Sequence, residues 1–102
     1  MPGLMHPKPR PRILDKQDRQ RARRAEERAV KAAIVRRDRG KCRVCGQPGY
    51  DMHELLPRGR GGRPSLRNSI LTCRGCHQLL HGHAIKVYGE DANRPLRFER
   101  LT

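Results

Sequence analysis

The chain has 102 residues and a formal net charge of +14, from 24 Lys and Arg against 10 Asp and Glu. Apolar residues make up 34% and aromatic residues 3% of the sequence, so we expect one small domain with little buried apolar surface and no second independent domain. No apolar run approaches the ~20 residues that span a bilayer and no signal-peptide core follows Met1, so we expect an intracellular protein without a membrane partner. A positive field attracts polyanions, which makes nucleic acid the leading partner.

The first two segments of the chain are basic and contain no cysteine. Residues 1 to 14 include four prolines, which block helix formation, and this predicts a disordered basic tail. Residues 15 to 39 are rich in Ala, Arg, Glu and Lys, which predicts a basic helix. Asp15 or Asp18 can cap this helix, and Gly40 can end it. A thin apolar stripe is expected from the three and four residue spacing of Ala22, Ala25, Ala29, Val30, Ala33 and Ile34.

The remainder of the chain contains two C-x2-C pairs, formed by Cys42, Cys45, Cys73 and Cys76. Each pair can wrap a metal ion with sulfur and backbone N–H groups, and four thiolates complete the tetrahedron that Zn2+ prefers in closed structural sites. Such a zinc contributes roughly 10 kcal/mol or more of folding free energy, which this small core does not supply. Disulfides, an iron-sulfur cluster or a redox pair are the alternatives. With no vacant coordination position, this zinc is expected to be structural.

Histidines lie close to the cysteine pairs at positions that suit a second site. The stretch YDMHELL alternates like a strand and places His53 near its end. A short helix from about Cys76 to His81 would place His77 and His81 on one face. Cys76 and His77 differ by about 100° around the helix axis, so one helix can serve two sites. Asn68, just before a second apolar strand, can tie the intervening loop by pairing with backbone groups.

The last segment alternates apolar and polar residues on either side of a turn sequence, GEDANRP. Ile85 and Val87 lie on one arm and Leu96 and Phe98 on the other, which predicts a β-hairpin. The whole pattern predicts a small α+β fold with an N-terminal basic helix and a C-terminal β-hairpin.

The order of these features resembles the HNH endonucleases. The first C-x2-C pair is followed by HELLPRGRGG and then by NSILTCRGCHQLLH, so a knuckle, His-x3-Pro, Gly-Gly, Asn, a second knuckle and a trailing His occur in turn. The resemblance covers roughly residues 36 to 83, and VRRDRGKCRVCG is similar to small phage and prophage members with a four-cysteine zinc site. It implies a ββα-metal fold, in a zinc-stabilised nuclease domain of residues 40 to 102, that holds a divalent ion beside a scissile phosphate.

The resemblance also implies a role for each matching residue. His53 falls on the metal ligand of the first strand, Asn68 on the asparagine that orders the loop, and His77 on the metal ligand of the helix. His81 matches an additional histidine ligand of some members. Glu54 departs from the family, which usually has a histidine there as general base. Three interpretations are open: Glu54 is the base, it is a metal ligand while His53 acts as the base, or it is an inactivating replacement.

Two kinds of metal ion are therefore implied. One is the structural Zn2+; the other, held by His53, His77 and His81, is a catalytic divalent cation such as Mg2+, Mn2+, Ni2+ or Zn2+. This cation would stabilise charge on the transition state and on the leaving oxygen. Arginines near the Gly-rich loop and at the end of the first helix are expected to bind the phosphates of nucleic acid: Arg58, Arg60, Arg63, Arg67, Arg36 and Arg37.

These features predict a metal-dependent DNA endonuclease that nicks or cuts duplex DNA with weak sequence specificity. A phage or prophage origin would place it in the host cytoplasm, with a packaging protein as a further partner. The alternative is a catalytically inactive, zinc-stabilised DNA-binding module, which would retain phosphate affinity without hydrolysis. A ribosomal-type RNA-binding zinc protein is a third interpretation, but it leaves the order of His53, Asn68 and His77 unexplained.

Overall fold

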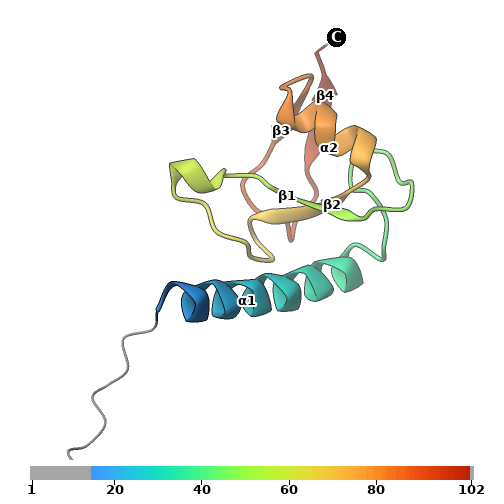
Figure 1. Cartoon of the computed structure of the whole chain (residues 1–102). Helices are drawn as coiled ribbons and strands as arrows, with labels where there is room; N and C mark the ends of the chain where they lie inside the picture. The colour runs from blue at the N-terminus through green and yellow to red at the C-terminus, as the bar shows by residue number, and fades with distance from the viewer. Residues whose placement is uncertain (1–14, 102) are drawn as a thin grey trace, which may run out of the picture.

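The structure is a computed structural model that describes residues 15–101, and the predicted tail, residues 1 to 14, lies outside the described residues. Two α-helices, one 3-10 turn and two antiparallel two-stranded sheets make up the described chain (Figure 1). Their bounds are α1 Lys16–Arg37, β1 Asp51–Glu54, η1 Arg58–Arg60, β2 Ser69–Thr72, α2 Arg74–His81, β3 Ile85–Tyr88 and β4 Arg97–Arg100. The predicted small α+β class is confirmed.

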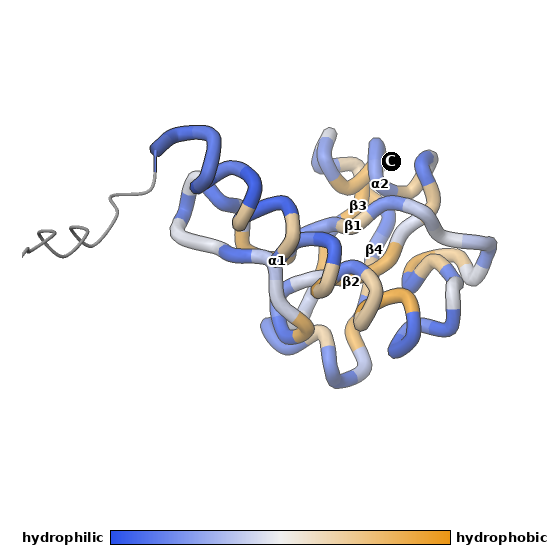
Figure 2. Tube along the Cα trace, turned by 60° about the horizontal axis from the view of Figure 1, so that its bottom comes forward, coloured by the Kyte–Doolittle hydropathy of each residue, from blue (hydrophilic) through white to orange (hydrophobic). Residues whose placement is uncertain are grey.

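Helix α1 forms because its 22 residues contain no Gly or Pro and because its first turn is capped. Asp15 is the N-cap, and its side chain accepts a hydrogen bond from the backbone N–H of Asp18 at 2.8 Å. Ile34, in the last turn, is the one buried residue of the helix, and most of its length is hydrophilic (Figure 2). Packing therefore holds α1 mainly at its C-terminal end.

Strands β1 and β2 pair in antiparallel register, with Asp51 opposite Thr72 and His53 opposite Ile70. Helix α1 packs on β2 and helix α2 packs on β1, so this ribbon lies between the two helices (Figure 1). Every residue of β2 is buried as a result. Side chains alternate between the two faces of a strand, so Asp51 and His53 share one face of β1 and Glu54 faces the other way.

Helix α2 begins at Arg74, two residues before its predicted start at Cys76. The reason is that Cys73 serves as the N-cap, with its Sγ accepting a hydrogen bond from the N–H of Cys76 at 3.3 Å. Sulfur is not among the side-chain groups that usually cap helices, so capping rules do not find this start.

The hydrophobic core is small and connects β2, α2 and the C-terminal hairpin. Its buried members are Ile70, Leu80, Ile85 and Ala92. Val87 and Phe98, which pair across β3 and β4, pack against this core from the hairpin. Neither helix of the described chain combines the length and the apolar content that crossing a bilayer requires.

A buried carboxylate at the end of α1 ties three segments together. The Asp38 side chain is only 2% exposed, and it accepts hydrogen bonds from Arg37 at 2.8 and 3.0 Å, from Arg43 at 3.1 Å and from the Leu71 N–H at 3.0 Å. Burial acts to raise the pKa of Asp38, but the hydrogen bonds from Arg37 and Leu71 and the charges of both arginines lower the pKa below its ordinary value. Asp38 therefore stays ionised and joins α1, the first cysteine knuckle and β2.

The two arginines extend this connection to other parts of the chain. Arg37 donates to the carbonyl oxygens of Leu66 and of Ser69, the latter at 2.6 Å, and Arg43 donates to the carbonyl oxygen of Ala92 at 2.7 Å. Arg37 was predicted from the sequence as a phosphate ligand. These internal acceptors occupy its guanidinium, so Arg37 serves the fold.

Replacing Asp38 by Asn is expected to lower the free energy of unfolding of the zinc-loaded protein by about 3 kcal/mol, since removing one partner of a buried ion pair leaves the arginines uncompensated. Because the pKa of Asp38 is lowered, its contribution is present above the ordinary Asp pKa and is lost as the pH falls through the lowered value. Urea unfolding at neutral pH measures the difference. Asp91→Asn is the control, because Asp91 is a more exposed carboxylate that pairs with Arg94 at 3.7 Å. Equal losses in both variants would contradict the role of Asp38.

Candidate functional site

The four cysteines lie together between the end of α1 and the start of α2. Their sulfur atoms all lie within 4.8 Å of one another, and the Sγ atoms of Cys45 and Cys73 are 3.7 Å apart. All four are free rather than disulfide-bonded. A tetrahedral zinc with Zn–S bonds of ~2.3 Å requires sulfurs about 3.8 Å apart, so the donor set fits that ion. The structure therefore brings the predicted ligands Cys42, Cys45, Cys73 and Cys76 into one candidate metal site.

The thiols of this cluster do not titrate alike. Burial acts to raise the pKa of Cys42, but backbone N–H groups of Cys45, Cys73 and Val44 lower it to about 7. Burial raises the pKa of Cys76, and the neighbouring sulfurs raise it further. The backbone thus favours the Cys42 thiolate near neutral pH, while a cation would be needed to bring the Cys76 sulfur into the same state.

The predicted histidines come from both elements that flank this cluster. His53 on β1 faces α2, and the ring centroids of His53 and His77 are 5.5 Å apart, with those of His77 and His81 6.0 Å apart. Two imidazoles that share one ion at about 2.1 Å per nitrogen have ring centres roughly 5 to 6 Å apart. The centroid distance of each pair falls within this range. The three histidines do not form a cluster as tight as that of the cysteines. In residues 15–101, the four sulfurs are the one set of three or more donor atoms that all lie within 4.8 Å of one another.

A carboxylate that the sequence analysis did not single out orients His77. The Nδ1 atom of His77 lies 3.1 Å from Oδ2 of Asp51, and Nε of Arg74 lies 3.6 Å from the same oxygen. The His77 hydrogen bond, followed by the charge of Arg74, lowers the pKa of Asp51. With Nδ1 engaged, the Nε2 atom of His77 is the nitrogen left to bind an ion. The sequence could have pointed to Asp51 through its spacing, because Asp51 precedes His53 by two residues and therefore lies on the same face of the strand.

His53 is held in its neutral form. Burial, together with the nearby His77 and His81, lowers the pKa of His53 to about 4. A neutral imidazole is the form that binds a metal ion, so His53 has the protonation state of a ligand at neutral pH.

Glu54 lies at the end of β1 and points away from the face that carries His53. Its Oε1 atom is 3.6 Å from the Arg58 guanidinium, which also donates to Glu27 of α1 at 2.7 Å. Its Oε2 atom is buried and has no hydrogen-bond partner within the described chain. Glu54 thus presents one oxygen near a cation and one free acceptor, which is the kind of group that can take a proton.

Asn68 fixes the loop between β1 and β2. Its side chain accepts from the Leu56 N–H at 2.8 Å and donates to the carbonyl oxygens of Leu56 and Arg63, each at 3.0 Å. Gly62 is required where this loop closes, because a Cβ there would lie 1.7 Å from the Leu56 carbonyl oxygen. The loop is therefore a compact turn built on the chain's own carbonyls, and it carries Arg58 in a defined place.

The other predicted phosphate ligands lie on the surface. Arg36, Arg60, Arg63 and Arg67 are exposed. Arg58 is 53% exposed at its side chain, although it is paired with Glu27. The surface thus presents several guanidinium groups to solvent, as binding to a polyanion requires.

Comparison with known proteins gives one partial similarity. A stretch of 62 residues is 31% identical to the Type IV methyl-directed restriction enzyme EcoKMcrA of Escherichia coli (strain K12), and it covers 51% of this chain and 22% of that protein. The chain thus spans less than a quarter of the length of this relative. No family model matches the chain.

Replacing Cys73 by Ser is expected to remove about one equivalent of bound zinc and to unfold the domain, because metal binding supplies roughly 10 kcal/mol or more of folding free energy. Metal analysis and circular dichroism of the purified protein measure both effects. The control is the wild-type chain stripped by a chelator, which should lose its fold and recover it when zinc is added back. A Cys73→Ser chain that keeps a full equivalent of zinc would contradict the four-sulfur site.

Proposed function

We propose that the chain is a metal-dependent DNA endonuclease that hydrolyses phosphodiester bonds. The observation that carries this proposal is that His53 on β1 and His77 on α2 meet with ring centroids 5.5 Å apart, directly beside the four-cysteine cluster. The partial similarity to a restriction enzyme and the net charge of +14 support it.

In this proposal, the four cysteines hold a structural Zn2+ and leave it no open position. That ion fixes the start of α2, where Cys76 is a ligand and His77 is its direct neighbour. Because successive residues of a helix differ by about 100°, Cys76 points to the cluster while His77 points to β1. The scaffold ion thereby positions the imidazole without taking part in hydrolysis.

The second cation would be held by His53 and His77, with His81 as an additional ligand. The donor chemistry fits, because two neutral imidazoles suit Mn2+, Ni2+ or Zn2+, and waters and phosphate oxygens can complete the shell of Mg2+. When bound, this ion supplies charge stabilisation for the phosphoryl oxygens and for the leaving oxygen. Asp51 engages Nδ1 of His77, which leaves Nε2 as the nitrogen available to an ion.

Glu54 is the proposed general base. Its carboxylate is the group that would accept the proton of an attacking water, and Arg58 at 3.6 Å from Oε1 offsets the repulsion between this carboxylate and a substrate phosphate. Asn68 holds the loop on which Arg58 lies. Phosphate contacts dominate binding in this scheme, so we expect weak sequence preference and affinity that falls steeply with salt. A phage or prophage origin, a cytoplasmic location and a packaging partner stay predictions of the family resemblance.

His77→Ala is expected to reduce the nicking of supercoiled plasmid by at least ~100-fold, because it removes a cation ligand and with it the stabilisation of transition-state charge. The assay compares zinc-loaded protein with added Mg2+, Mn2+ or Ni2+ by gel electrophoresis. The control is His83→Asn, since His83 is exposed and has a left-handed backbone, φ 61°, that Asn tolerates. If wild-type protein retards the plasmid without cutting it in any of these metals, the chain is a DNA-binding module and not a nuclease.

Glu54→Gln is expected to reduce cleavage by at least ~100-fold while the affinity for the second cation stays unchanged, because the amide keeps the shape of the carboxylate but cannot accept a proton. Calorimetric titration with Ni2+ measures cation binding separately from turnover. Loss of cation binding would instead assign Glu54 as a ligand, with His53 left as the base. Undiminished cleavage would contradict both catalytic roles.

A further inference from the structure

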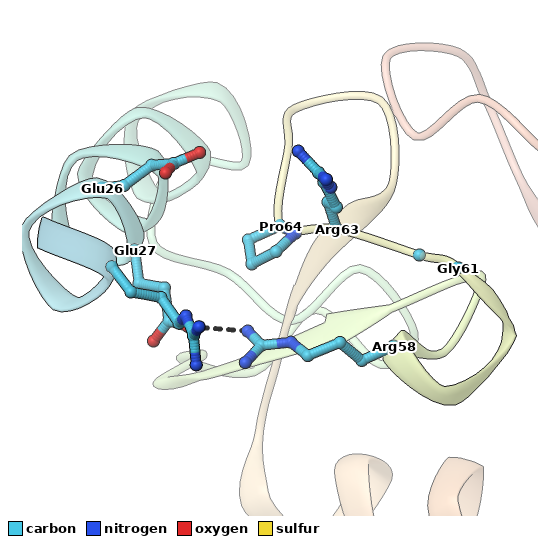
Figure 3. A pocket seen from close by; sticks show the side chains of 8 residues that line it. Glu26, Glu27, Arg58, Gly61, Arg63 and Pro64 are labelled. Atoms are coloured by element: carbon cyan, nitrogen blue, oxygen red, sulfur yellow. Dashed lines mark hydrogen bonds and ion pairs between the residues drawn. The ribbon is translucent and has the colours of Figure 1, made fainter. Parts of the chain in front are cut away.

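A groove of about 570 Å³ separates α1 from the Gly-rich loop, away from the histidines (Figure 3). Helix α1 contributes Arg23, Glu26 and Glu27 to its lining, and the loop contributes Arg58 and Arg63. Three guanidinium groups and two carboxylates thus line one open space. The arginines give the groove the positive charge that binding an anion requires, and the two glutamates neutralise part of that charge.

The Arg58 side chain reaches from the loop toward α1 (Figure 3). Its Nη2 atom donates to Oε1 of Glu27 at 2.7 Å and lies 3.6 Å from Oε1 of Glu54. A carboxylate and a phosphate use the same guanidinium donors in the same geometry. Glu27 therefore occupies the place that a phosphate oxygen would take.

We propose that this groove binds a backbone phosphate of duplex DNA, and that Glu27 holds Arg58 in the free protein and releases it when the phosphate enters. The proposal rests on DNA as the partner in the proposed function. It adds a binding site outside the histidine pair and assigns Glu27 as an internal competitor for the DNA.

The exposure of the pair permits such an exchange. The side chains of Arg58 and Glu27 are 53% and 34% exposed, so water and salt screen their attraction and the pair adds little to stability. A backbone phosphate carries one negative charge and two free oxygens, as a carboxylate does, but in this groove it would also lie near the guanidinium groups of Arg23 and Arg63. Replacing one weak partner by a better one requires no change in the loop, which Asn68 and Gly62 hold in place.

The surroundings of the groove favour a long polyanion over a small one. Helix α1 carries further exposed cations on the turns around the groove, at Arg24, Arg28 and Lys31. A duplex places phosphates at regular intervals along its length, so it can contact the groove and these side chains together. A free phosphate ion can contact only the groove.

A purely structural role for the pair predicts the opposite sign. If Glu27 and Arg58 served only to fasten α1 to the loop, removing Glu27 would loosen the helix and weaken DNA binding. If Glu27 competes with phosphate, removing it strengthens binding. The two roles are therefore separable in one measurement.

The test is the affinity of the zinc-loaded full chain for a fluorescent duplex, measured by anisotropy without added divalent cation. Glu27→Gln should tighten binding about threefold, in keeping with the weak coupling of exposed ion pairs. Glu26→Gln is the matched control, because it removes the same charge from the same helix but leaves the hydrogen bond between Glu27 and Arg58 intact, and its effect should be smaller. Arg58→Ala should weaken binding and lower the slope of log affinity against log salt by about 0.9, the value for one lost phosphate contact.

The decisive quantity is how much more Glu27→Gln raises the affinity for the duplex than Glu26→Gln does. This excess should vanish when Arg58→Ala is present in both chains. Equal effects of the two substitutions, weaker binding by Glu27→Gln, or an excess that survives without Arg58 would each overturn the proposal. Thermal unfolding of each variant confirms that it is folded. Because the assay contains no added divalent cation, these affinities are independent of cleavage, and a chain that never nicks DNA can still support or refute the groove.

Discussion

The ionised carboxylate of Asp38 is the contact on which the arrangement of this small protein depends. It accepts hydrogen bonds from Arg37, from Arg43 and from the backbone of Leu71, so one buried charge fixes the end of α1 against the first knuckle and β2. Without it, α1 would have little to hold it, because Ile34 is the only side chain that the helix buries. A buried carboxylate stabilises the fold only when hydrogen-bond donors surround it. Here the donors come from three segments of the chain: the end of α1, the first knuckle and β2. The position of α1 beside the Gly-rich loop, and hence the groove between them, follows from this anchor.

The four-cysteine cluster has the corresponding role at the start of α2. In residues 15–101 the connected hydrophobic cluster has four fully buried members, so it cannot supply the stability of a domain by itself. A metal held by four sulfurs can supply it, and it acts where Cys73 caps α2 and Cys76 enters its first turn. Because His77 follows Cys76 directly, the same ion would stabilise the fold and aim an imidazole at β1. The stability of the domain and the position of His77 therefore both depend on the first turn of α2.

Sequence patterns were sufficient wherever the signal was local. Composition and capping predict α1, alternation predicts the hairpin of Ile85–Tyr88 and Arg97–Arg100, and the C-x2-C spacing predicts the sulfur cluster. The contacts that sequence did not predict join residues with no fixed spacing: Asp38 with Leu71, Asp51 with His77, and Glu27 with Arg58. Each is an acid in a basic chain, and its partner is determined by packing rather than by periodicity. The excess of Arg and Lys also makes these contacts hard to predict, because any acid in this sequence has several possible partners along the chain.

The placement of these acids explains how so basic a chain folds. Self-repulsion among 24 Lys and Arg destabilises the compact state, and only 10 Asp and Glu oppose it. Asp38 and Asp51 offset positive charge at the end of α1, where Arg37 and Arg43 lie, and beside Arg74. The Asp38 side chain is almost fully buried, whereas Glu27, which pairs with Arg58, is 34% exposed at its side chain. The Asp38 pairs are therefore committed to the fold. In the proposed mode of DNA binding, the exposed pair of Glu27 and Arg58 is the one that a phosphate replaces, while the buried pairs of Asp38 keep the site in place.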